Sequence, residues 1–342
     1  MEKTVWTRRL ALGGAMALGA CGLASLRAGA EPSLNDSLSG DLSPVHDPCI
    51  IREGGTYHLF CTSQMREGKG LIHWRTSPDL RAWTFKGAVM QTFPDWVTQA
   101  IPDTRGAWAP DISFENNEFR LYYAASLFGK NQSVIGLMAT PTLDTTRADF
   151  GWKDQGLVVA THPDDNFNAI DPNLIVDAKG RHWLALGSFW SGLKLVALDP
   201  TTGKPKEAKP NFLSLAEREA PDAIEGAFII RKGDWYYLFA SYDFCCRGVN
   251  STYYTVVCRS KDVKGPYVDR HGKKMLSGGG TLVLSADMDP TKRFKGPGHC
   301  AILQDTNADY IVYHAYDAQN NGRPTLRIQK LNWTADGWPV AV

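Results

Sequence analysis

The chain contains 342 residues, a length that fits two domains or one large β domain. Its 37 Lys and Arg residues balance 36 Asp and Glu residues, and a net charge of +1 sets aside partners bound mainly by charge, such as nucleic acid. A hydrophobic content of 43% with 21% charged residues argues against a disordered chain, while 11 Trp, 12 Tyr, 14 Phe and 32 Gly suit many short strands, tight turns and sugar-binding surfaces.

The first 30 residues have the three parts of an export signal. Arg8 and Arg9 form a basic region, an apolar stretch continues to Leu26, and small residues end the segment at Ala30. The paired arginines resemble a twin-arginine signal, with a general secretory signal as the alternative. Cys21 follows residues that resemble a lipoprotein processing box, so lipidation at Cys21 is an alternative to cleavage after Ala30.

These features predict the domain organisation and the location of the protein. We expect residues 1–30 to be the export signal, 31–40 a linker and 41–342 one domain. The apolar stretch is shorter and richer in glycine than a membrane span of about 20 residues, so we expect no membrane span. The mature protein is expected to be a monomer, periplasmic or extracellular, with a lipid anchor if Cys21 is modified.

Five segments of the remaining chain share one pattern. Each opens on an ionisable residue, continues with a short apolar run and a turn, and ends in an aromatic-rich run closed by Ser or Tyr. Two such runs around a turn predict a hairpin, and a third strand follows in every unit. This repeat predicts an all-β, single-domain, five-bladed β-propeller, with a β-sandwich as the alternative. The opening residues are Asp47, Asp111, Asp171, Glu225 and His299.

The five opening residues are also the candidate functional site. If each begins the innermost strand of its blade, all five approach the central axis from different blades and gather in one place. The alternative is that each is a polar residue that caps a strand. Because clustered carboxylates repel one another, such a cluster usually indicates catalysis or a bound cation.

Six cysteines remain after the leader. The adjacent pair Cys245 and Cys246 could form a vicinal disulfide, and no spacing typical of a zinc site is present. The scattered cysteines are expected to be small buried hydrophobic residues. They are Cys49, Cys61, Cys258 and Cys300.

Several motifs occur together in one order along almost the whole mature chain, from about Asp41 to Val342. Taken together they resemble glycoside hydrolase family 43, and more narrowly its endo-1,5-α-L-arabinanases. The motifs are Val45-His46-Asp47-Pro48, Trp108-Ala109-Pro110-Asp111, Asn168-Ala169-Ile170-Asp171-Pro172, Gly187-Ser188-Phe189-Trp190, Glu225-Gly226-Ala227, Cys245-Cys246-Arg247-Gly248 and Gly296-Pro297-Gly298-His299.

The resemblance implies an inverting hydrolase with three catalytic carboxylates. Asp47 would be the general base, Glu225 the general acid, and Asp171 the residue that tunes the acid and orients the substrate. Inversion requires two carboxyl groups about 6.5–9.5 Å apart, with room for a water between base and sugar. The acid must stay protonated, which a neighbouring Asp171 carboxylate would favour by like-charge repulsion.

The resemblance also implies a metal and a set of sugar contacts. His299 matches a histidine that holds a metal, generally calcium, in the central cavity, although calcium prefers oxygen ligands. The alternative is a histidine that hydrogen-bonds a carboxylate. Ordinary blade packing is the alternative for Trp108 and Trp190. The implied substrate-binding residues are Asp47, Trp108, Phe128, Asn168, Asp171, Ser188, Phe189 and Trp190.

Three functions remain open at this point. The first is an exported hydrolase that cleaves internal α-1,5-L-arabinofuranosyl linkages, with arabinan or an arabino-oligosaccharide as its partner. The second is an exo-acting arabinofuranosidase or β-xylosidase on the same fold. The third is a propeller lectin that binds oligosaccharide without cleaving it, which the three carboxylates disfavour.

Overall fold

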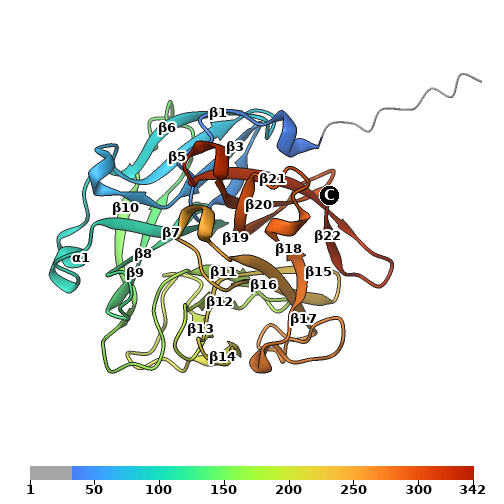
Figure 1. Ribbon diagram of the computed structural model, residues 1–342. Coiled ribbons are helices and arrows are strands. Elements are labelled where there is room, and N and C mark those ends of the chain that lie inside the picture. Colours follow the sequence, from blue (N-terminus) through green and yellow to red (C-terminus); the bar gives the residue numbers. More distant parts are fainter. Residues whose placement is uncertain (1–32) are drawn as a thin grey trace, which may run out of the picture. The chain divides into compact units, whose positions relative to one another are not determined.

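Five sheets follow one another along residues 33–342, the part of the chain that the computed structural model describes (Figure 1). The predicted export signal, with Cys21, lies outside the described residues. The innermost strand of each sheet contacts the innermost strand of the next, and the last contacts the first. The ring of inner strands is therefore closed, and the fold is the predicted five-bladed β-propeller. The inner strands are β2 (Cys49–Glu53), β7 (Gly106–Glu115), β11 (Asn173–Val176), β15 (Ile224–Lys232) and β19 (Phe294–Gln304).

Each blade continues outward from its inner strand through three more antiparallel strands. In the first two blades these are β3 (Thr56–Cys61), β5 (Leu71–Ser77) and β6 (Ala82–Met90), then β8 (Glu118–Ser126), β9 (Ser133–Thr140) and β10 (Lys153–Thr161). In the last three they are β12 (His182–Leu186), β13 (Leu193–Leu198) and β14 (Leu213–Ala216); β16 (Trp235–Tyr242), β17 (Tyr254–Ser260) and β18 (Thr281–Leu284); and β20 (Asp309–Asp317), β21 (Arg323–Trp333) and β22 (Pro339–Ala341).

Short elements occupy the connections. Two-residue strands extend the first two sheets, and the helices are a single α-helix and several 3₁₀ turns among the described residues. They are β1 (Ser39–Gly40), β4 (Ser63–Gln64), α1 (Asp95–Ala100), η1 (Leu34–Ser37), η2 (Met65–Glu67), η3 (Gly248–Asn250), η4 (Met275–Ser277), η5 (Ala286–Met288) and η6 (Ala318–Asn320).

The start of the described chain joins the first blade to the last. The β1 strand pairs in parallel with β6 of the first blade. On the other side, the Leu326 N–H donates to the Leu42 carbonyl at 2.9 Å, and the Ile328 N–H donates to Asn35 Oδ1 at 2.8 Å. Part of the segment predicted to be a linker, 31–40, thus packs on the propeller and helps to close the ring.

The core lies between neighbouring blades, because each sheet is apolar on both faces. The aromatic runs of the second strands supply much of it, as the repeat indicates. Tyr122 of β8 packs with Leu184 of β12, and Phe239 of β16 packs with Ile311 of β20. All four side chains are fully buried. Such packing fixes the blades against one another and so fixes the residues at their inner ends.

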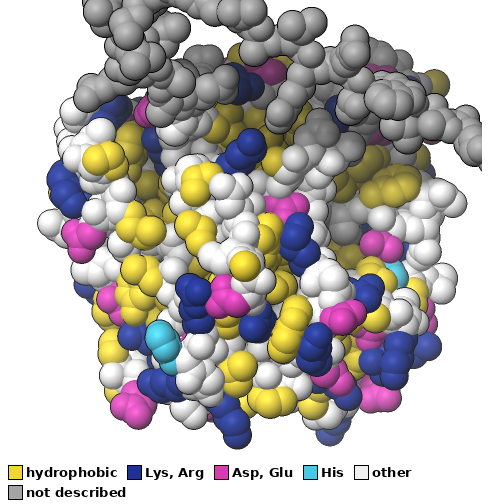
Figure 2. All heavy atoms as spheres, turned by 90° about the vertical axis from the view of Figure 1, so that its right-hand side faces the viewer, with side chains coloured by type: hydrophobic (Ala, Val, Ile, Leu, Met, Phe, Trp, Pro, Cys, Tyr) yellow, Lys and Arg dark blue, Asp and Glu magenta, His cyan; other side chains and the backbone are white. Residues whose placement is uncertain are grey.

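Charged side chains of both signs share one face of the molecule. Figure 2 shows one face of the molecule, on which basic and acidic side chains are interspersed. This arrangement agrees with the net charge of +1. Among residues 33–342, none of the helices has the length and apolar character that a membrane crossing requires.

Candidate active site

In every blade the backbone bends at a residue in the left-handed region, which lies within the inner strand or two residues before it. Register shifts accompany the bend in β7, β15 and β19. Asp and Gly adopt positive φ more readily than most residues, which suits three of the five positions. Such bends re-aim side chains at the end of a strand. The residues are Asp47 (φ 49°), Ala109 (φ 43°), Asp171 (φ 57°), Gly226 (φ 63°) and His299 (φ 47°).

The bends correct one sequence-based expectation, that Asp111 joins the cluster. Ala109, not Asp111, occupies the bend of the second blade, so Asp111 lies two residues further along β7. Its carboxylate accepts hydrogen bonds from Asn173 Nδ2 at 3.1 Å and from the Leu174 N–H at 2.8 Å. Burial raises the pKa of Asp111 to about 7. Asp111 therefore connects two inner strands and is not a member of the candidate active site.

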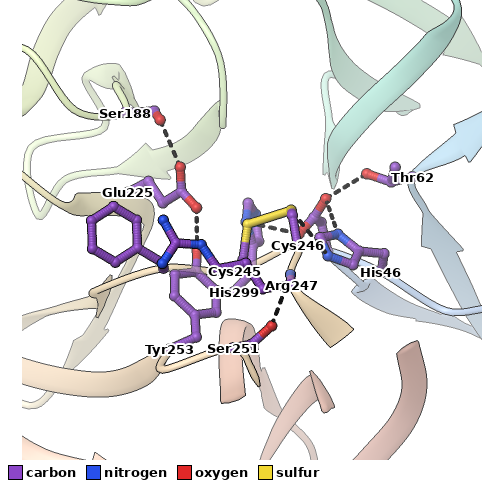
Figure 3. The surroundings of a disulfide bond; sticks show 12 residues. His46, Thr62, Ser188, Glu225, Cys245, Cys246, Arg247, Ser251, Tyr253 and His299 are labelled. Carbon is purple, nitrogen blue, oxygen red and sulfur yellow. Dashed lines mark hydrogen bonds and ion pairs between the residues drawn. A yellow bond between two sulfur atoms is a disulfide. The ribbon is translucent and has the colours of Figure 1, made fainter. Parts of the chain in front are cut away.

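Asp47, the predicted base, is buried among hydrogen-bond donors from separate segments. The Thr62 hydroxyl donates to Oδ2 at 2.6 Å, and His46 Nδ1 lies 2.8 Å from the same oxygen. His299 Nδ1 lies 3.2 Å from Oδ1. The Asp47 backbone N–H donates to Nδ1 of the fully buried His314 at 3.1 Å. Figure 3 shows His46, Thr62 and His299 arranged around this point.

These contacts leave Asp47 charged and with one free position. A carboxylate has about four acceptor positions. Thr62 and His46 contact Oδ2, whereas Oδ1 contacts His299 Nδ1 at 3.2 Å, and His314 Nδ1, 3.7 Å from Oδ1, already accepts the Asp47 N–H. Burial alone would raise the pKa of Asp47, but His46 and His299 outweigh burial and hold that pKa well below its ordinary value. Asp47 can therefore hold a water on Oδ1 and accept a proton from it.

Glu225, the predicted acid, is held by two hydroxyl groups. Ser188 donates to Oε2 at 2.6 Å and Tyr253 donates to Oε1 at 2.8 Å. Burial, together with the charges of Glu225 and Asp171, raises the pKa of Tyr253 well above its ordinary value, so this hydroxyl keeps its proton and remains a donor. Figure 3 shows Ser188 and Tyr253 on opposite sides of the Glu225 carboxyl group, which is thereby fixed in orientation.

Asp171 lies beside Glu225 and shares its electrostatic environment. Asp171 Oδ2 accepts the N–H of Gly226, the residue after Glu225, at 3.0 Å. Burial and the charges of Glu225 and Asp47 raise the pKa of Asp171 well above its ordinary value. Asp171 therefore retains its proton at pH values where an isolated carboxyl group has lost it.

A strained turn connects the third blade to the strand of Glu225. Phe189 and Trp190 both have positive φ, 54° and 46°, which costs non-glycine residues of order 1–3 kcal/mol each and tends to occur at functional sites. The Phe189 N–H donates to the carbonyl of Ile224 at 2.9 Å, directly before Glu225. The turn therefore positions Ser188 against Glu225 and leaves the Phe189 and Trp190 side chains partly exposed.

The remaining predicted sugar contacts have different surroundings. Asn168 is buried, and its Oδ1 accepts the Ser133 hydroxyl at 2.6 Å. Trp108 is partly exposed, and its Nε1 is buried without a hydrogen-bond partner among residues 33–342. Phe128 is 78% exposed. The roles of Asn168, Trp108 and Phe128 in sugar binding stay predictions.

Hydroxyl residues at the ends of the second strands hold the inner strand of the next blade. Thr62 accepts the Ala109 N–H at 2.8 Å, and Ser241 accepts the His299 N–H at 2.7 Å. Ser188 donates to Glu225 in the same way. Ser188 and Ser241 are closing residues of their repeat units, and that regular position was a signal for this role. In the first unit Thr62, the residue before the closing Ser63, has the role instead. His314 and Tyr253 left no such signal.

The surroundings of His299 do not by themselves build a calcium site. Its Nδ1 faces Asp47 Oδ1. The groups of described residues that could share a metal ion are His46 with Asp47 and His314, or His46 with Cys245 and Cys246, and neither includes His299. Calcium takes 6–8 oxygen ligands, so a calcium at His299 would depend almost entirely on water.

Comparisons with known proteins show the family of the chain. A family model, glycosyl hydrolases family 43, matches residues 43–339. The chain is 41% identical over 307 residues to the extracellular exo-alpha-(1->5)-L-arabinofuranosidase ArbA of Cellvibrio japonicus (strain Ueda107), covering 86% of this chain and 85% of that protein. It is also 41% identical over 297 residues to the extracellular endo-alpha-(1->5)-L-arabinanase 1 of Bacillus subtilis (strain 168), covering 86% and 87%.

A solved structure is similar over nearly the same span. The alpha-L-arabinanase of Cellvibrio cellulosa complexed with arabinohexaose superposes with a TM-score of 0.81 at 40% sequence identity, covering 88% of this chain and 96% of that one. The family model spans Asp47, Asp171 and Glu225, and each of the two relatives covers 86% of the chain. The chain therefore belongs to glycosyl hydrolase family 43.

Proposed function

We propose that the protein is an inverting hydrolase that cleaves internal α-1,5-L-arabinofuranosyl linkages of arabinan. The observation that carries this proposal is the contrast between Asp47, which His46, Thr62 and His299 surround, and Glu225, which Ser188 and Tyr253 hold beside Asp171, a carboxyl group whose pKa is raised. Inverting hydrolysis requires one carboxylate that takes a proton and one carboxyl group that gives one. The arabinanases among the relatives supply the substrate class.

Each carboxylate has one task in the proposed mechanism. Asp47 orients a water through its free Oδ1 position and takes a proton from it as the water attacks the anomeric carbon. Glu225 gives its proton to the departing O5 of the neighbouring arabinose. Asp171 favours the protonated acid by like-charge repulsion. A base of low pKa suffices, because the sugar is already cation-like when the water attacks, and this makes the water more acidic.

Incubation with linear, debranched arabinan tests the proposal. A ladder of oligosaccharides is expected for endo action. Arabinose alone would indicate exo action. Exo action is the second candidate because the relative from Cellvibrio japonicus is named an exo-acting arabinofuranosidase and has the same 41% identity. An unchanged polymer that still binds the protein would indicate a lectin.

Inversion predicts the configuration of the first product. Proton NMR of the early reaction should show the new reducing end as the β-anomer, since the water attacks from the face opposite the α-linkage. The α-anomer should grow only later, through mutarotation. Early formation of the α-anomer would instead indicate a covalent intermediate and contradict the base role of Asp47.

Calcium at His299 is a separate proposal that the mechanism does not use. We expect the purified wild-type protein to retain calcium after dialysis and His299→Ala to lose it, measured by inductively coupled plasma mass spectrometry. His162→Ala is the matched control, because the His162 side chain is exposed. Equal calcium in the wild type and His299→Ala would remove the ligand role.

Export is proposed from the leader and from the relatives, two of which are named extracellular. N-terminal sequencing or mass spectrometry of the mature protein distinguishes cleavage after Ala30 from lipidation at Cys21. Size-exclusion chromatography with light scattering tests the proposed monomer.

Gly298 offers a test of the Tyr253 contact. A Cβ atom at position 298 would overlap the Tyr253 ring. We expect Gly298→Ala to displace Tyr253 from Glu225, to lower kcat by at least about tenfold, as for the loss of one charge-assisted hydrogen bond, and to lower the free energy of unfolding by about 1–3 kcal/mol. Gly55→Ala, where a Cβ atom meets nothing within 4 Å, should change neither quantity. Unaltered kinetics in Gly298→Ala would show that Tyr253 does not hold the acid.

A further inference from the structure

A disulfide between adjacent residues lies at the edge of the active site. Cys245 and Cys246 are bonded in the connection from β16 to β17, and Cys246 is exposed. Figure 3 shows the pair close to His46 and His299, on the side of the site away from Ser188. The other cysteines of residues 33–342, Cys49, Cys61, Cys258 and Cys300, are buried free thiols. This confirms that the scattered cysteines are core residues and singles out the vicinal pair.

The disulfide is connected to the catalytic base by a chain of hydrogen bonds across three blades. The Cys246 N–H donates to the Tyr316 hydroxyl oxygen at 2.7 Å. The same hydroxyl lies 2.7 Å from His46 Nε2. His46 Nδ1 in turn lies 2.8 Å from Asp47 Oδ2. Cys246 belongs to the fourth blade and Tyr316 to the fifth, and His46 directly precedes Asp47 at the first.

One neutral tautomer of His46 completes an unbroken donor-to-acceptor sequence from Cys246 to Asp47. The Tyr316 oxygen accepts from Cys246, so its single proton is available to His46 Nε2. Burial raises the pKa of Tyr316, which keeps that proton in place. A neutral His46 that accepts at Nε2 carries its proton on Nδ1, where it donates to Asp47. This chain of hydrogen bonds through Tyr316 and His46, the relay, thus directs the Nδ1–H group of His46 at Asp47 and orients the Asp47 carboxylate.

The disulfide holds the first donor of the relay in place. Cys246 has φ 65°, in the left-handed region that residues other than glycine rarely adopt. The bond between neighbouring sulfur atoms closes a small ring around the peptide that joins the two residues, and the donor in the relay is the N–H of that peptide. The Arg247 N–H donates to Ser251 Oγ at 3.0 Å, which anchors only the following peptide.

We propose that the Cys245–Cys246 disulfide is a positioning element for the catalytic base, acting through Tyr316 and His46, and that its reduction lowers turnover. The proposal rests on the proposed hydrolase activity. A small dithiol supplies the two electrons and two protons of the reduction. The Cys245–Cys246 bond breaks, two thiols form, and the dithiol becomes its cyclic disulfide.

Kinetics before and after treatment with dithiothreitol test the proposal, with the thiols counted by alkylation and mass spectrometry. We expect reduction to lower kcat on arabino-oligosaccharide about tenfold and to leave KM within about twofold, as for an interaction made only in the transition state. Tyr316→Phe, which keeps the disulfide and removes the relay hydroxyl, should start at the lower kcat and lose nothing further on reduction. The Cys245→Ala/Cys246→Ala variant should show the reduced value with or without dithiothreitol.

Two kinetic outcomes would overturn the proposal. One is an unchanged kcat in wild-type protein whose two thiols are shown to be free. The other is an equal loss on reduction in the wild type and in Tyr316→Phe, since that result would place the effect of the disulfide outside the relay.

A second measurement needs no substrate and so separates this proposal from the proposed activity. In the oxidised protein, ¹H–¹⁵N spectra of the imidazoles should show His46 protonated at Nδ1 and unprotonated at Nε2. Reduction should remove this single tautomer, and an unchanged His46 spectrum would contradict the proposal. An oxidised protein that cleaves no arabinan would instead count against the proposed function.

Discussion

Replacing Glu225 by Gln lowers kcat on linear arabinan by about 10²–10⁴-fold, the usual contribution of a general acid, and changes the Kd for arabino-oligosaccharide little. The amide keeps the size of the side chain and can still accept from Tyr253 at Oε1, but it has no proton to give. Steady-state kinetics and isothermal titration calorimetry measure the two quantities.

The leaving group distinguishes a lost acid from a disturbed site. A nitrophenyl arabino-oligosaccharide releases a phenolate that needs no protonation, so Glu225→Gln should be far less impaired on it than on arabinan. The matched control is Ser188→Ala, which keeps the acid and removes one of its two hydrogen bonds. The kcat of Ser188→Ala should fall about tenfold on both substrates. An equal loss of activity on both substrates in Glu225→Gln, or full activity of this variant on arabinan, would contradict the acid role of Glu225.

The sequence was sufficient to predict the architecture because the information lies in a repeat. Hairpin turns, aromatic second strands and one polar opening residue recur in every unit, and each hairpin forms between neighbouring segments. The same repeat predicted that Asp47, Asp171, Glu225 and His299 meet at one end of the ring. Closure of the ring by the chain from Asn35 to Val45 was not predicted, because it depends on contacts with the last blade.

Register within a blade was less certain from sequence. The charge pattern predicts Asp111 as the opening residue of the second unit and so as a member of the cluster. The structure places Ala109 at the bend instead. Ala-Pro before Asp111 corresponds to Asp47-Pro48 and Asp171-Pro172, so the proline was the better guide to the bend than the charge.

The residues that tune the carboxylates could not be predicted, because they are distant in the sequence. His314 contacts Asp47 across 267 positions, and Tyr316 contacts His46 across 270. His314 lies in no motif or repeated position. Tyr316 is the closing residue of the fifth unit, but that position did not indicate its contact with His46. The disulfide was left open for a related reason, since adjacent cysteines fit a bonded pair or two free thiols equally well until the local backbone is known.

Replacing Asp47 by Asn should be at least as damaging as the change at Glu225, with a loss of about 10²–10⁴-fold in kcat, the usual contribution of a general base. Asn keeps the shape of the side chain, but its amide cannot take a proton from the water. The variant also loses the negative charge that His46 and His299 surround. Kinetics on linear arabinan measure the loss, and circular dichroism checks the fold.

Thr62→Val is the control for Asp47→Asn, because it keeps the base and removes one donor at 2.6 Å from Oδ2. A single hydrogen bond to a charged group is worth about 1.5–3 kcal/mol, so Thr62→Val should lose roughly 10–150-fold. The two variants should respond alike to the leaving group and differ in this from Glu225→Gln. A nitrophenyl leaving group should restore neither, because both changes act on the attacking water and not on the departing oxygen. Recovery of Asp47→Asn on that substrate would mean that Asp47 assists departure, and the roles of Asp47 and Glu225 would then have to be exchanged.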